Sequence, residues 1–256
     1  PATTDVASLE LKMSHAKDSC WVDYAPMGGL VPWNTADLIP MAKAGVASFK
    51  AFVATCGSDK AGVFQNVTDW ELYRGMREIA KVDGLVVVHC ENATITDELG
   101  REAMEEGKTL VSDYVATRPI FTEVEAVRRV LMIAEATGCR VHIAHCSCHE
   151  AVEAVEEAKA RGVNASFESC PHYLLLATEE LDAIGPKAKC SPPIRDRKHR
   201  ERMWELLAEG RIEMLVSDHS PCTIDLKSDP NAFKAWGGIS AAQNCVDAMF
   251  DEAVLK

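Results

Sequence analysis

Six short apolar runs, separated by longer stretches of helical pattern, constrain the fold of this 256-residue chain more than any other feature. Each run is rich in Val, Ile, Phe or Ala, as buried strands are. Strand-length runs that alternate with helices are typical of β-α units, in which a helix returns the chain to the start of the next parallel strand. We predict an α/β fold with parallel strands at 21–26, 46–54, 85–90, 140–146, 164–170 and 213–217.

The connecting segments include two amphipathic helices. The first is predicted over 123–137, where apolar residues recur at helical spacing, Thr122 and Glu125 have the spacing of a capping box, and Gly138 is expected to end the helix. The second is predicted over 149–160, with Val152 and Val155 on one side and acidic residues and lysine on the other. No repeat or low-complexity linker divides the chain, so we predict a single domain over 1–256.

The position of polar residues distinguishes a barrel from an open nucleotide-binding sheet. The chain has no GxGxxG and no GxxxxGK[ST] motif, which such an open sheet would show. Polar side chains instead follow the ends of the predicted strands, where (β/α)8 barrels place their chemistry. These residues are Lys50, His89, His145, His172 and Asp218. We therefore predict most of a (β/α)8 barrel.

Composition excludes several classes of protein. A net charge of -12, with no basic stretch, argues against a nucleic-acid partner. The longest apolar runs are too short to cross a membrane, and the first residues lack a signal-peptide pattern, so we expect a soluble cytoplasmic protein without membrane partners. Ten cysteines without a CxxC pair, many inside apolar runs, are expected to be reduced, mostly buried thiols.

Two histidines and one aspartate are candidate metal ligands. His89 ends the run VVVHC, although a single histidine there could equally be a hydrogen-bonded core residue. Strand alternation turns His142 and His145 to opposite faces, so we expect one ligand, His145, and a packed His142. Asp218 could alternatively cap the next helix. Together, two imidazoles and a carboxylate at strand ends are the ligands that zinc and similar cations prefer.

Lys50 lies between Phe49 and Phe52 in an apolar strand, where an unpartnered ammonium is costly. An amine that has reacted with CO2 becomes an anionic carbamate, which can bridge two metal ions. This hypothesis explains the lysine if the site is binuclear. The alternatives are an ion pair with Glu91 or Asp218, or a side chain that extends to solvent.

With these residues placed, segments along the whole chain resemble the cyclic amidohydrolases of the amidohydrolase superfamily, and within them the allantoinases. The resemblance rests on GVASFKAFVATCG, VVVHCENATITDELG, DYVATRPIFTEVEAVRRVL, ESCPHYLLL, AKCSPPIRD, LVSDHSPC and AWGGIS, in this order. It implies a TIM barrel enzyme that opens the ring of allantoin by hydrolysis, with a metal-bound hydroxide, to give allantoate in purine degradation. It also implies a homotetramer.

The resemblance implies a role for each candidate residue. Lys50 would be the carboxylated ligand that bridges two divalent metal ions, expected to be zinc, and His89 and His145 would bind the second metal. Asp218 would bind the first metal and act as catalytic base. Ser220 and the backbone around Ser191 would face the substrate. His172 and His219 are expected to support the ligands, and His15, His149 and His199 are expected to be surface residues without a role.

The chain departs from the family pattern in one respect: it contains no HxH motif, which supplies two further ligands in family members. We expect the chain to be an excerpt of a longer protein that also contains two more β-α units and a small β-rich domain. By itself the excerpt is predicted to be poorly stable and prone to aggregate, because an incomplete barrel has open edges.

Three alternatives to an allantoinase remain at this point. Hydantoinases and dihydropyrimidinases are the nearest, but they place a tyrosine where this chain has Thr55 and an Asn-Gly segment near Trp236. Dihydroorotase fits the long shared segments less well. A non-catalytic scaffold of the same fold is the third alternative; the retained Lys50, His89, His145 and Asp218 argue against it, whereas the absent HxH favours it.

Overall fold

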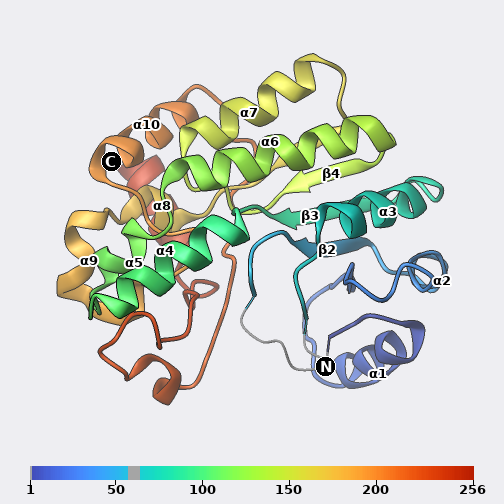
Figure 1. Cartoon of the computed structure of the whole chain (residues 1–256), viewed down its shortest axis with the longest axis horizontal. Coiled ribbons are helices and arrows are strands. Elements are labelled where there is room, and N and C mark those ends of the chain that lie inside the picture. Colours follow the sequence, from blue (N-terminus) through green and yellow to red (C-terminus); the bar gives the residue numbers. More distant parts are fainter. Residues whose placement is uncertain (1, 57–63) are drawn as a thin grey trace. The chain divides into compact units, whose positions relative to one another are not determined.

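The computed structural model describes residues 2–56 and 64–256 (Figure 1). The chain forms two compact units, and the long helices α6 (Ile120–Thr137) and α7 (His149–Ala160) contribute to both. Unit 1 comprises Pro1–Ala93, Ala126–Ala144 and Val155–Ser166; unit 2 comprises Thr94–Glu125, His145–Ala154 and Phe167–Lys256. The single domain over 1–256 remains a prediction.

A parallel sheet organises unit 1. Its strands follow one another in chain order from β1 to β5, and each pair from β1 to β4 is parallel. Figure 1 shows β2, β3 and β4 side by side in this order. The strands are β1 (Met27–Gly29), β2 (Ser48–Phe52), β3 (Leu85–His89), β4 (Arg140–Ile143) and β5 (Ala165–Phe167). Four of the predicted runs therefore contain strands, and the predicted parallel α/β fold is confirmed.

The strand predicted at 21–26 is wrong. Trp21 and Val22 are 97% and 78% exposed, and the first strand, β1, begins only at Met27. Two of the three residues of this strand are glycines, and large side chains lie close to their backbone. A Cβ on Gly28 would come within 3.1 Å of the Phe49 ring, and one on Gly29 within 2.6 Å of the Phe64 ring. A strand whose only apolar side chain, Met27, is 42% exposed leaves no hydrophobic pattern to detect.

The run at 213–217 forms only an isolated parallel bridge between Leu215 and Ser169, in unit 2. The Ser169 amide donates to the Met214 carbonyl at 3.1 Å, and the Val216 amide donates to the Ser169 carbonyl at 3.0 Å. The strand predicted at 213–217 is therefore reduced to a single bridge, which is parallel as predicted.

Helices cover most of the remaining described chain. Besides α6 and α7, they are α1 (Val6–Lys17), α2 (Leu38–Lys43), α3 (Asp69–Ala80), α4 (Ala93–Glu105), α5 (Val111–Ala116), α8 (Pro171–Leu175), α9 (Thr178–Ile184), α10 (Arg197–Ala208) and α11 (Cys245–Phe250). Three shorter helical turns are η1 (Gly185–Ala188), η2 (Ile224–Lys227) and η3 (Asp251–Leu255). None of the described helices is long and apolar enough to cross a bilayer.

Helix α6 begins earlier than predicted, at Ile120 directly after Pro119. The Thr122 hydroxyl donates to the Pro119 carbonyl at 2.7 Å, so Thr122 lies inside the first turn and the predicted capping box with Glu125 is wrong. The end of the helix is as predicted, because Gly138 has a φ of 66°, a left-handed conformation that suits glycine.

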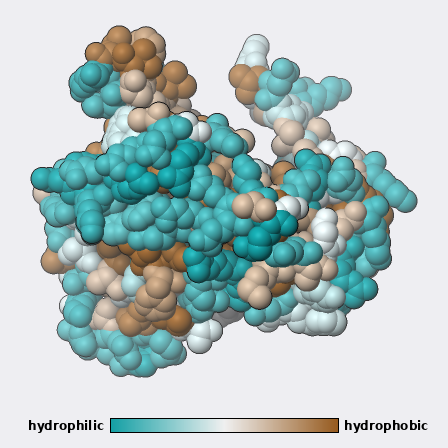
Figure 2. All heavy atoms as spheres, turned by 90° about the horizontal axis from the view of Figure 1, so that it is seen from above, coloured by the Kyte–Doolittle hydropathy of each residue, from teal (hydrophilic) through white to brown (hydrophobic). Residues whose placement is uncertain are grey.

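Helix α7 matches its predicted bounds and its predicted faces. Val152 and Val155 are fully buried, whereas Glu157 and Lys159 are exposed. Hydrophilic residues cover most of the molecular face drawn in Figure 2, and hydrophobic residues gather there in separate patches. This distribution agrees with helices that turn one apolar side inward.

Unit 2 has an apolar core of its own, in which small cysteines pack between aromatic and aliphatic residues. Its members include Tyr114, Cys170, Tyr173, Leu181 and Cys190. All ten cysteines are free thiols and most are buried, which confirms the prediction. Burial raises the pKa of Cys139 to about 12 and that of Cys170 further above its ordinary value, so these thiols stay protonated and act as small apolar residues.

Candidate metal and substrate site

Lys50 and His89 lie on neighbouring strands of unit 1. Lys50 pairs in register with Val87, and Phe52 pairs with His89, two residues further along both strands. Because side chains two residues apart point to the same face, Lys50, Phe52 and His89 share one face of the sheet. The Lys50 ammonium lies 4.8 Å from the centre of the Phe52 ring, and the Phe52 and His89 rings are 5.2 Å apart.

His89 is held by a carboxylate. Its Nε2 lies 2.8 Å from Oε2 of Glu91, and both side chains are buried. In metal sites, a carboxylate on one imidazole nitrogen fixes the ring so that the other nitrogen can bind the metal. This contact agrees both with a hydrogen-bonded core histidine and with an oriented ligand. The sequence pattern indicated Glu91 only as an alternative partner of Lys50.

His142 is a packed residue, as predicted. It is 6% exposed, and its Nδ1 lies 2.8 Å from the Ser166 hydroxyl. The register places His142 beside Val87, which pairs in turn with Lys50. His142 therefore points to the same face of the sheet as Lys50, and its strand position is level with Val87, two residues before His89. Strand alternation alone did not predict that His142 shares this face with Lys50.

His145 and Asp218 lie in unit 2 and share an unusual backbone conformation. Each has a φ of 42°, in the left-handed region that non-glycine residues seldom adopt. The backbone near each residue is hydrogen bonded to the same segment, 168–169. The Cys146 amide donates to the Glu168 carbonyl at 2.7 Å, and Leu215 forms a parallel β-bridge with Ser169. Strained backbone of this kind persists where surrounding structure holds it, often at functional sites.

Their exposures differ, since His145 is buried and Asp218 is exposed in this chain. His145 and Asp218 thus lie in one unit, and Lys50 and His89 in the other. That the two pairs converge on one site remains a proposal. The imidazoles of His89 and His145 and the carboxylate of Asp218 are ligand types that fit a divalent cation, whereas Lys50 would fit only after conversion to an anionic carbamate.

The two serines predicted to face substrate are joined through one loop of unit 2. The Trp236 indole donates to the Ser220 hydroxyl at 3.2 Å, and the Ser220 amide donates to the Ile239 carbonyl at 3.0 Å. In the same loop, a Cβ on Gly237 would lie 3.8 Å from the Ser191 hydroxyl. The AWGGIS segment therefore lies against both serines.

Tyr114 and Lys189 are additional polar residues beside Ser191. The Tyr114 hydroxyl is hydrogen bonded to the Ser191 hydroxyl, and the Lys189 ammonium lies 4.5 Å from the centre of the Tyr114 ring. Lys189 donates to the Ala235 carbonyl at 2.7 Å; burial, aided by nearby positive charges, lowers its pKa to about 8. Neither residue is indicated by the sequence, because an isolated tyrosine or lysine carries no spacing signal.

His172 and His219 occupy different environments. His172 is the second residue of α8 and is buried, and neither ring nitrogen has a hydrogen-bond partner among the described residues. Burial lowers its pKa to about 4, so the ring is neutral at physiological pH. His219 is exposed, and its Nδ1 accepts from the Ala242 amide at 3.2 Å. Their supporting role remains a prediction.

A buried ionic network holds the loop that follows His145. Glu123 accepts from the Ser147 amide at 2.9 Å and from Arg195 at 2.7 Å, and Arg195 also donates to the Ser147 hydroxyl at 2.8 Å. Arg195 further donates to the Arg118 carbonyl at 2.6 Å. Three segments of unit 2 are therefore tied together two residues from His145.

Comparison with known proteins agrees with this architecture. Residues 31–151 match the family described as dihydro-orotase-like. Allantoinases from Salmonella newport and Salmonella enteritidis are each 51% identical over 259 aligned positions, covering 100% of this chain and 56% of the relative. The chain thus spans little more than half the length of these relatives.

The solved structures point to the same group of enzymes. An L-hydantoinase (dihydropyrimidinase) from Arthrobacter aurescens matches with a TM-score of 0.94 and 32% identity, over 99% of this chain and 56% of that chain. The chain belongs to the amidohydrolase superfamily. A D-hydantoinase from Thermus sp. matches with a TM-score of 0.87 and 28% identity, over 97% of this chain and 55% of that chain.

Membership in the superfamily confirms the predicted fold class. The hydantoinases are TIM-barrel proteins, and this chain matches about 56% of the first of them, which is consistent with an incomplete barrel. TIM barrels carry their chemistry at the C-terminal ends of the strands. His89 ends β3 in this way, whereas Lys50, predicted at a strand end, is the middle residue of β2.

Proposed function

We propose that this chain carries the metal-holding and substrate-contacting part of an allantoinase, which opens the cyclic amide ring of allantoin by hydrolysis to give allantoate. The observation that carries the proposal is the 51% identity to allantoinases across the whole chain. Thr55 and Trp236, which differ from the expected hydantoinase pattern, support this substrate over hydantoin.

Four residues would hold two divalent metal ions, with zinc as the expected metal: Lys50, His89, His145 and Asp218. A neutral Lys50 amine would add CO2 and release a proton, and the carbamate would supply two anionic oxygens. The contact between His89 and Glu91 supports an oriented imidazole ligand. When bound, the metals would lower the pKa of water and polarise the ring carbonyl.

The remaining steps belong to side chains of this chain. Asp218 would accept a proton from the attacking water and return it to the departing ring nitrogen, as a general base and then a general acid. Its left-handed backbone and exposure in unit 2 support a side chain held for chemistry rather than for packing. Ser191 and Ser220, with Tyr114 beside Ser191, would bind the polar groups of the substrate.

A chimera tests the activity directly. This chain would replace the matching 56% of the Salmonella newport allantoinase, and ring opening would be measured with allantoin, hydantoin and dihydroorotate. We expect turnover of allantoin and its loss in Asp218→Ala, because no other group would move the proton. Asp247→Ala, an exposed residue of α11, is the matched control and should keep full turnover.

A hydantoinase-type enzyme is the second candidate, and the 0.94 TM-score to an L-hydantoinase favours it. Turnover of hydantoin in preference to allantoin would replace our proposal with this one. Bound metal without turnover of any of the three substrates would instead favour a non-catalytic scaffold.

A homotetramer and a cytoplasmic location also remain proposals. The first rests on the family resemblance, and the second on apolar runs that are too short to cross a membrane.

A further inference from the structure

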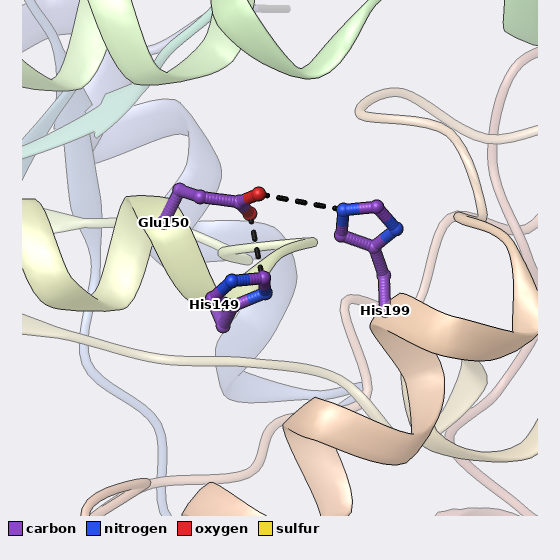
Figure 3. A group of neighbouring side chains, drawn as sticks. All are labelled: His149, Glu150 and His199. Atoms are coloured by element: carbon purple, nitrogen blue, oxygen red, sulfur yellow. Dashed lines mark ion pairs between the residues drawn. The ribbon is translucent and has the colours of Figure 1, made fainter.

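Two histidines and a glutamate of unit 2, none of them assigned to the hydrolytic site, form a compact cluster. His149 and Glu150 begin α7, and His199 lies in the first turn of α10. The Glu150 carboxylate pairs with both imidazoles (Figure 3), whose ring centres are 5.5 Å apart. Its Oε2 is 3.3 Å from Nδ1 of His149, and its Oε1 is 3.4 Å from Nε2 of His199.

The cluster contains buried polar atoms that the protein does not satisfy. Nδ1 of His149 and Oε2 of Glu150 are buried and have no hydrogen-bond partner among the described residues, although they face each other. Leaving such atoms without a partner costs free energy. A cation between them would satisfy both, because it accepts a lone pair from the imidazole and from the carboxylate.

His199 is oriented in the way that metal-binding histidines usually are. Its Nδ1 lies 2.7 Å from Oδ1 of Asp196, the residue that caps α10. A carboxylate on one ring nitrogen fixes the tautomer and leaves the other nitrogen with its lone pair. Here the other nitrogen is Nε2, which points toward Glu150.

The spacing suits a small divalent ion of the zinc class. One donor atom from each of the three residues lies within 4.8 Å of the other two. A tetrahedral zinc ion with bonds of about 2.0–2.2 Å holds its ligand atoms roughly 3.3 Å apart. The separations from Glu150 to His149 and to His199, 3.3 Å and 3.4 Å, have this length. They involve different carboxylate oxygens, so the carboxylate would turn to offer one oxygen to an ion held by both imidazoles.

We infer that His149, Glu150 and His199 form a second divalent-metal site, which takes Zn²⁺ or a similar borderline cation. Two nitrogens and one carboxylate leave a fourth position for water. The positive N-terminal ends of the α7 and α10 dipoles repel a cation at this position. They also favour neutral imidazoles, which are the form that binds metal. A bound ion would join the first turns of the two helices. Mg²⁺ and Ca²⁺, which prefer oxygen ligands, would bind poorly.

Metal binding by the chelator-stripped chimera with the Salmonella newport allantoinase tests this inference. We would titrate the chimera that carries this chain unchanged, as wild type, and its variants His149→Gln, Glu150→Gln and His199→Gln with Zn²⁺, against a competing chromophoric chelator. Each variant is expected to bind one equivalent fewer than the wild type. His15→Gln, which alters an exposed histidine of α1, should bind as many ions as the wild type. Asp196→Asn should lower the affinity of this site for Zn²⁺ by about 10–100-fold.

Wild-type stoichiometry in the His199→Gln variant would overturn the inference and leave the cluster as a set of ion pairs. A second measurement on the wild type avoids any folding defect of a variant. Zn²⁺, but not Mg²⁺, should slow modification of His199 by diethyl pyrocarbonate, read by mass spectrometry of the peptide. An equal rate with and without Zn²⁺ would contradict the site. The result is independent of allantoin turnover, because Lys50 and Asp218 do not belong to this cluster.

Discussion

The guanidinium of Arg195 donates to the carboxylate of Glu123 at 2.7 Å, with the two side chains only 5% and 2% exposed. The pair ties the first turn of α6 to the segment before α10, and both partners also bind Ser147, two residues from His145. A buried pair of this kind leaves an uncompensated charge when one partner is removed.

Glu123→Gln should therefore destabilise the protein by about 3–5 kcal/mol, because the Arg195 charge would remain buried without its counterion. The change would be measured by urea unfolding. Glu135→Gln is the matched control, because it removes an exposed pair with Arg161 and should cost at most about 1 kcal/mol. Equal losses of stability in the two variants would show that the buried pair contributes no more than an exposed one.

Glu91→Gln should weaken metal binding at the proposed hydrolytic site by about 10–100-fold, because the amide orients His89 less strongly than the carboxylate at 2.8 Å does. Competition with a chelator in the chimera would measure the affinity. Glu98→Gln, on the exposed side of α4, should leave it unchanged. If Glu91→Gln retained wild-type affinity, His89 would be better described as a core histidine.

Gly238→Ala should displace Ser220. The glycine has a φ of 155°, and an added Cβ would lie 2.3 Å from the Ser220 hydroxyl oxygen. We expect a stability loss of about 1–3 kcal/mol from the backbone strain and a raised KM for allantoin.

Gly100→Ala is a suitable comparison, because no atom of another described part of the chain lies within 4 Å of its added Cβ. In the interior of α4 it should stabilise the protein by about 0.5–1 kcal/mol. An unchanged KM in Gly238→Ala would remove Ser220 from the proposed substrate contacts.

His172 should make the protein sensitive to acid. Its pKa falls from 6.5 to about 4 on folding, because burial disfavours the charged ring. Between these values the unfolded chain binds a proton that the folded protein does not, so stability should fall as the pH drops from about 6.5 toward 4. The full effect is roughly 3 kcal/mol.

Urea unfolding at a series of pH values would measure this slope. His172→Leu should reduce the dependence of the free energy of unfolding on pH, because leucine does not titrate. His15→Gln should leave this dependence unchanged. An unchanged slope in His172→Leu would assign the acid sensitivity to other groups.

Regular local patterns could be predicted because they depend on neighbouring residues along the chain. The apolar run of β3, the two faces of α7 and the glycine after α6 follow from periodicity and from the conformational freedom of glycine. For the same reason, the amino-acid sequence alone indicates Lys50 within an apolar strand and His89 at the end of the next one as candidate site residues.

The remaining features depend on residues that are distant in the sequence, so tertiary structure decided them. β1 is a strand because its backbone pairs with β2, with Phe49 and Phe64 close to its glycines. Glu123 is buried together with its partner Arg195. His149 and His199 belong to different helices, and only their packing brings them to one glutamate. Hydrophobic periodicity determines which face of an element is buried, but shape and charge complementarity between elements determine which side chains meet there.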